Sequence, residues 1–147
     1  MRLRRDGDGY RLRLGRQERE LLARLAAELR SLVEEREPDP SLARLFPPAY
    51  EDAENSAEFD RLVRQGLVSV KSEGLATLER TAGADRLTRA ELETWVVALN
   101  DLRLVLGTRA GVEEEMEESR YAEPAVALYA WLSWVQGTAI EALAAEL

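Results

Sequence analysis

Residues 87–107 constrain the fold more than any other part of the chain, because their helical pattern is apolar on nearly every side. Thr88 and Glu91 have the spacing of a capping box, in which each side chain accepts from the other residue's backbone N–H. Gly107 fits the C-cap position. The apolar residues form a main stripe and a far side: Leu92, Trp95, Leu99, Leu102 and Leu106, then Val97, Leu104 and Val105. A helix that is apolar all round must lie at the centre of a fold.

Apolar residues at helical spacing predict four further helices. They span residues 16–35, 56–66, 67–81 and 124–147, with Ser56 as a cap, Gly66 as a break and Pro124 in the first turn of the last helix. Residues 2–14 read as a β-hairpin that turns at two glycines within 6–9. The sequence therefore predicts a mainly α protein, a compact bundle of about five helices with an N-terminal β-hairpin. We expect a single domain over residues 1–147, with the hairpin in 1–15 and the bundle in 16–147.

The chain contains no cysteine and no histidine. Without cysteine it has no disulfide, thiolate zinc site or thiol nucleophile. Without histidine it lacks the commonest general base and transition-metal ligand, so Ser-His-Asp and Cys-His catalysis are excluded. No nucleophile–base arrangement is visible among the carboxylates, Arg, Tyr, Ser, Thr and Lys71. We therefore expect a protein that is not an enzyme and that binds no metal and no cofactor.

The formal net charge of −8 is unevenly distributed along the chain. Residues 1–19 carry seven arginines against Asp6, Asp8 and Glu18, which leaves −12 on residues 20–147. An acidic body repels nucleic acid, so any contact with DNA has to use the basic N-terminal edge. We therefore expect a protein partner and regard nucleic acid as the less favoured one.

Alternation along the hairpin puts four arginines on one face: Arg2, Arg4, Arg11 and Arg13. This face is a candidate partner-binding site for an acidic protein surface. It is also a candidate for phosphates, because a two-stranded ribbon fits a DNA major groove. The other interpretation is a solvated outer face, balanced by the glutamates of residues 113–118.

Asn100, Asp101 and Arg103 form a polar cluster in the middle of the apolar helix. One interpretation is a pocket around Arg103 and Asn100 that takes a small ligand or a peptide terminus. The favoured interpretation is a buried ion pair that fixes the helix register, since a buried guanidinium needs a carboxylate or several carbonyls.

Two aromatic features are further candidates for partner binding. Phe46 and Tyr50 flank Pro47-Pro48, which forms either a docking ledge or a rigid plug over the helix ends. Trp134 lies off the apolar stripe of the last helix, beside small residues, so it faces either another helix or another subunit. The second alternative predicts a homodimer.

The N-terminus carries charges but lacks the apolar core of a signal peptide. No apolar run in the chain approaches membrane-spanning length. We therefore expect a soluble, cytoplasmic protein with no membrane partner.

Three segments together resemble a known family: residues 45–50 (LFPPAY), 94–109 (TWVVALNDLRLVLGTR) and 129–132 (YAWL). The family is actinobacterial, is catalogued only as a domain of unknown function, and is typically encoded beside the ClpS protease adaptor. Genes for a JAMM-type peptidase, a sulfur-carrier protein and a cysteine synthase often lie close by. The resemblance brings no established activity, but it implies a link to proteolysis or to sulfur and cysteine stress.

These observations favour a non-enzymatic interaction module, an adaptor or regulatory partner in a ClpS-linked proteolysis or sulfur/cysteine stress pathway. The alternative is a DNA-binding transcriptional regulator that uses the arginine face of the hairpin. The acidic body favours the first function over the second.

Overall fold

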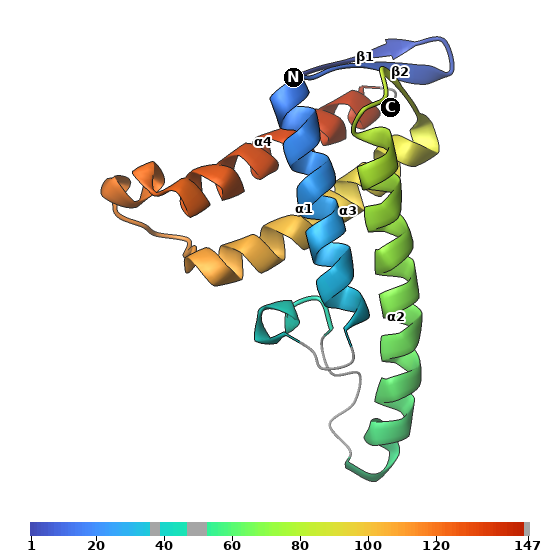
Figure 1. Ribbon diagram of the computed structural model, residues 1–147, viewed down its shortest axis with the longest axis vertical. Coiled ribbons are helices and arrows are strands. Elements are labelled where there is room, and N and C mark those ends of the chain that lie inside the picture. Colours follow the sequence, from blue (N-terminus) through green and yellow to red (C-terminus); the bar gives the residue numbers. More distant parts are fainter. Residues whose placement is uncertain (36–38, 47–52, 146–147) are drawn as a thin grey trace.

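The computed structural model describes residues 1–35, 39–46 and 53–145, and the chain is mainly helical with a small sheet beside its N-terminus (Figure 1). Within these residues the α-helices are α1 (Arg16–Glu34), α2 (Ala53–Thr81), α3 (Arg89–Ala110) and α4 (Pro124–Ala144). The strands are β1 (Arg2–Asp6), β2 (Gly9–Arg13) and β3 (Arg86–Thr88). Two short 3-10 helices lie in the connections, η1 (Pro40–Leu42) and η2 (Glu118–Ala122). The predicted fold class, a helical bundle with an N-terminal β-hairpin, is confirmed.

α3 lies at the centre of the bundle and contacts each of the other three helices. Trp95 and Leu99 are fully buried, and the indole N–H of Trp95 donates to Thr81 Oγ1 (2.6 Å), which ties α3 to the end of α2. Val97 is an exception to the predicted burial, because its side chain is 59% exposed. One strip of α3 is therefore uncovered.

The two ends of α3 test the predicted capping residues. The capping box is present: Glu91 N–H donates to Thr88 Oγ1 (3.1 Å), and Thr88 N–H donates to Glu91 Oε1 (2.8 Å). The predicted C-cap at Gly107 is wrong, since α3 continues to Ala110 and ends at Gly111, whose φ is 67°. Gly107 is instead buried against α4, where a Cβ atom would lie 3.0 Å from the Tyr129 ring. Its small size serves helix packing.

The N-terminal hairpin forms as predicted and gains a third strand that the sequence pattern did not reveal. β3 pairs antiparallel with β2 and places Leu87 beside Tyr10. These side chains and Leu12 are buried in the core. Gly9 permits the pairing, because a Cβ atom there would lie 2.7 Å from the Leu87 carbonyl oxygen.

α2 is one continuous helix of 29 residues, so the predicted break at Gly66 and the predicted cap at Ser56 are wrong. A glycine inside a helix costs about 1 kcal/mol relative to alanine. Full burial of Leu75 and Leu78 further along α2 outweighs that cost. The N-terminal part of α2 extends past the end of α1, at the bottom of Figure 1.

Candidate functional site

The sheet gathers on one face the four arginines predicted for the hairpin. In the β1–β2 register Arg2 lies opposite Arg13, and Arg4 lies opposite Arg11. All four residues are exposed, and together they line a cavity of about 170 Å³. The hairpin thus brings four guanidinium groups to one surface.

β3 adds a fifth arginine to this surface. Arg86 is the β3 neighbour of Arg11, so Arg4, Arg11 and Arg86 form a row across the three strands. Sequence patterns alone do not reveal Arg86, because three residues with one apolar position are too few to identify a strand. We call the five residues the arginine face: Arg2, Arg4, Arg11, Arg13 and Arg86.

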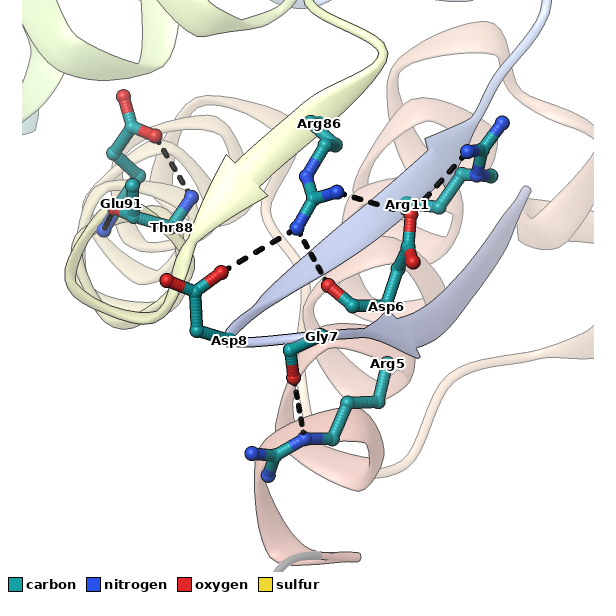
Figure 2. Close-up of polar contacts among 8 residues, drawn as sticks. All are labelled: Arg5, Asp6, Gly7, Asp8, Arg11, Arg86, Thr88 and Glu91. Atoms are coloured by element: carbon teal, nitrogen blue, oxygen red, sulfur yellow. Dashed lines mark hydrogen bonds and ion pairs between the residues drawn. The ribbon is translucent and has the colours of Figure 1, made fainter.

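Asp6 supplies negative charge to the arginine face (Figure 2). Its Oδ2 atom lies 3.2 Å from an Nη atom of Arg11 and 3.2 Å from an Nη atom of Arg86. Arg86 also lies 3.5 Å from a carboxylate oxygen of Asp8, whose side chain is fully exposed. These ion pairs offset the positive charge of Arg11 and Arg86 at the tip of the hairpin.

No carboxylate among the described residues offsets the charge of the other three arginines of the face. The guanidinium groups of Arg2, Arg4 and Arg13 have no hydrogen-bond or ion-pair partner in the described part of the chain. Arg4 nevertheless lies opposite Arg11, and like charges directly opposite each other destabilise a sheet. The arginine face therefore keeps a net positive charge on an otherwise acidic protein.

Arg19 of α1, which sequence patterns also do not reveal, holds the sheet in place. Its half-buried guanidinium donates to the carbonyl oxygens of Leu12 (3.2 Å), Leu14 (2.9 Å) and Ala84 (2.6 Å). One side chain thereby joins α1 to β2 and to the loop before β3. No local signal distinguishes Arg19 from the other arginines of its helix, because its partners are backbone groups brought close only by the fold.

The predicted central polar cluster divides between two sides of α3. On the side of α4, Arg103 donates to Ser133 Oγ (2.8 Å) and Gln136 Oε1 (2.6 Å). It also donates to the Tyr129 hydroxyl (3.2 Å) and, at 3.4 Å, to Asn100 Oδ1. These acceptors are all neutral, so Arg103 forms no ion pair with the described residues. The interaction is a hydrogen-bonded clamp between α3 and α4.

Asp101 pairs instead with Lys71 of α2, at 3.0 Å. The two side chains are 6% and 15% exposed. Burial raises the pKa of the Asp101 carboxyl above its ordinary value, and the Lys71 ammonium offsets part of this effect. A buried ion pair is therefore present, but its cation is the single lysine rather than Arg103.

The aromatic candidates lie in different surroundings. Phe46 is half-buried against the core, with the Arg64 guanidinium 4.5 Å from its ring centroid, which favours the plug over the ledge. Tyr50 and Pro47-Pro48 lie outside the described residues. Trp134 is 49% exposed on α4, and Ala130 and Gly137 lie one turn away on the same helix.

The arginine face is suited to binding anions rather than to catalysis. Guanidinium groups stay protonated and donate paired hydrogen bonds to carboxylates and phosphates. They supply neither a nucleophile nor a general base near neutral pH. The described residues contain no group of three or more Asp or Glu side chains placed to hold a metal ion. No helix among them is both long enough and apolar enough to cross a bilayer.

Fold and site together define a mainly helical bundle that carries a cationic three-stranded sheet. The chain belongs to the DUF2017 family, a domain of unknown function whose family model matches residues 1–143. No curated protein and no solved structure matches the chain. The family assigns no activity, so the function has to be argued from the site.

Proposed function

We propose that this protein is a non-enzymatic interaction module whose arginine face binds an acidic segment of another protein. The observation that carries the proposal is the pairing of Arg4 with Arg11, and of Arg2 with Arg13, across two strands. Such like-charged pairs destabilise a sheet when no anion lies between them. Residues that break a local folding rule are concentrated at functional sites, which supports a binding role for these arginines.

Strand geometry indicates the form of the partner. Arg2 and Arg4 are two residues apart on β1, so successive arginine pairs are separated by about 6.8 Å. An extended segment with Asp or Glu at every second residue repeats its carboxylates at the same spacing. Each carboxylate then lies between two guanidinium groups and accepts charge-assisted hydrogen bonds from both.

The charge of the remaining chain favours a protein partner over DNA. Residues 20–147 carry −12. This charge repels the long, densely charged backbone of a DNA duplex more than a short acidic segment that contacts the arginine face alone. The alternative, a DNA-binding transcriptional regulator, uses the same face in the major groove. That face is three strands wide, whereas the alternative assumed a two-stranded ribbon.

The family resemblance supplies the proposed setting. We propose that the protein acts in the cytoplasm as an adaptor or regulatory partner in ClpS-linked proteolysis or in a sulfur and cysteine stress pathway. The support is the resemblance of residues 94–109 to a family typically encoded beside ClpS. Purified ClpS is therefore the first natural partner to titrate.

Fluorescence anisotropy at physiological salt tests the partner class with three labelled probes. These are a peptide with glutamate at every second residue, a peptide of the same composition with its glutamates in one block, and duplex DNA. The alternating peptide should bind about tenfold more tightly than the block peptide. Arg4→Gln combined with Arg13→Gln should abolish this binding. Arg24→Gln, which removes an exposed arginine from α1, is the matched control and should leave it unchanged.

Two results contradict the proposal. Equal binding of the two peptides removes the spacing argument. Tight DNA binding that is lost in the Arg4→Gln, Arg13→Gln variant favours the regulator instead. For four phosphate contacts, the logarithm of DNA affinity should then fall with the logarithm of salt with a slope of about −3.6.

A further inference from the structure

A second surface lies between α2 and α3, on residues that take no part in the arginine face. The two helices enclose a groove of about 530 Å³. Gly74 of α2 and Ala98 of α3 line it. Gly74 has no side chain and Ala98 has a single methyl group, which leaves the space open. Val70 and Val97 line it too, one from each helix, and are 64% and 59% exposed. A groove with exposed apolar side chains on both walls and a few polar groups is a candidate binding site.

The lining of the groove has a net negative charge. Lys71 and Asp101 line it as an ion pair, so they add no net charge. Glu73 of α2 and Glu93 of α3 line it as well, and both are exposed. Glu93 meets Arg89 of its own helix at 2.9 Å, whereas Glu73 has no ion-pair partner in the described ranges.

The groove is elongated along both helices. Its α2 lining runs from Leu67 to Thr77, and its α3 lining runs from Ala90 to Asp101. Ten residues of helix span about 15 Å, or nearly three turns. An apolar groove of this length with a floor of small residues fits a helix better than a compact small molecule.

We propose that the α2–α3 groove binds one amphipathic helix of a second protein, whose apolar side chains cover Val70 and Val97. Charge complementarity selects a helix with basic side chains beside its apolar stripe, because Glu73 and Glu93 face it. The inference does not depend on the proposed function, since the arginine face and the groove share no residue. The two surfaces select partners of opposite charge, so the two partners do not compete for one surface.

The probe for this groove is a labelled synthetic helix with leucines along one stripe and lysines beside it. A second helix, with glutamates in place of the lysines, is the comparison probe. The lysine probe should bind at least about tenfold more tightly than the glutamate probe. Val97→Lys removes the apolar contact and repels the lysine probe, so it should abolish binding without lowering the thermal midpoint, because the residue is exposed. Ile140→Lys places the same charge at an exposed position outside the groove and should change nothing.

Glu73→Lys combined with Glu93→Lys should reverse the preference toward the glutamate probe. Equal binding of the two probes overturns the proposal, as does lysine-probe binding that survives Val97→Lys. Sedimentation tests whether the groove is instead occupied by a second copy of this chain. A parent dimer that Val97→Lys converts to a monomer also overturns the proposal.

Discussion

Arg4 lies directly opposite Arg11 across β1 and β2, and among the described residues Arg11 alone of the two has an ion-pair partner, Asp6. The positive charge that suits this surface to an anionic partner therefore opposes formation of the sheet that displays it. The Arg4 side chain therefore favours binding of an anion but lowers the stability of the sheet.

Arg4→Gln should stabilise the protein by about 0.2–1 kcal/mol in low salt, because it removes the repulsion from Arg11. Urea denaturation measures the change. The gain should shrink as salt is added, since exposed charges are screened. Arg4→Lys keeps the charge and is the control, for which we expect no gain. A less stable Arg4→Gln protein in low salt contradicts the prediction.

Leu99→Ala and Leu102→Ala should each lower the free energy of unfolding by about 2–5 kcal/mol, because both leucines are buried at the centre of the bundle. Val97→Ala on the same helix should change it by about 0.5 kcal/mol or less, because Val97 is exposed. Chemical denaturation of the three variants provides the comparison. Equal losses in all three would remove α3 from the centre of the fold.

The capping box of α3 should make the free energy of unfolding depend on pH in the acidic range. The Thr88 backbone N–H donates to Glu91 and holds the pKa of its carboxyl below the ordinary 4.5, with Arg80 contributing. A lowered pKa contributes stability above pH 4.5 that is lost as pH falls through the folded-state value. Glu91→Gln should therefore flatten the pH dependence of unfolding in this range. Thr88→Ala should cost about 1 kcal/mol at neutral pH.

Local signals predicted the helices that have strong start residues. Thr88 and Glu91 form the capping box, and Pro124 begins α4. Local signals failed where a residue is compatible with two conformations and tertiary packing selects one of them. Gly66 is compatible with a helix or with a break, and only the leucines buried further along α2 decide between them.

The candidate site was predictable to the extent that it follows strand alternation. The hairpin arginines share a face because side chains alternate along any strand. Arg86 joins them through a pairing between β2 and β3, which are far apart in sequence. Lys71 likewise meets Asp101 through the packing of α2 on α3. Helical and strand periodicity carry no information about contacts between distant elements, so these partners could be identified only from the structure.

Lys71→Met should destabilise the protein by about 3–5 kcal/mol at neutral pH, because it leaves Asp101 buried without a cation. Burial already raises the pKa of Asp101, and losing Lys71 should raise it further. A raised pKa destabilises the fold above the folded-state value, and the penalty is relieved as pH falls. The difference in the free energy of unfolding between the Lys71→Met variant and the parent should therefore become smaller in mild acid.

Denaturation at neutral and mildly acidic pH measures this difference. Lys71→Arg keeps the positive charge and is the matched control, while Lys71→Met with Asp101→Leu should recover much of the lost stability. If this difference in the free energy of unfolding becomes larger in acid, the buried, unpaired negative charge is not that of Asp101. Glu73 and Glu93 line the same groove, so their replacement by glutamine tests whether they contribute to the pH dependence.

The exposed indole of Trp134 predicts self-association through α4. The small neighbours Ala130 and Gly137 allow a second helix to approach this side of α4 closely. Trp134→Glu should then give a folded monomer, and sedimentation across a range of concentrations measures the change. A parent protein that is monomeric throughout that range contradicts the prediction.

The ion pair between Asp6 and Arg86 joins residues 80 positions apart in the chain. A peptide copy of the hairpin alone lacks Arg86 and the helices that bury Tyr10, and an isolated hairpin is marginally stable in water. The complete arginine face thus exists only after the chain has folded through β3. A partner that binds this face consequently distinguishes the native protein from a nascent or unfolded copy of it.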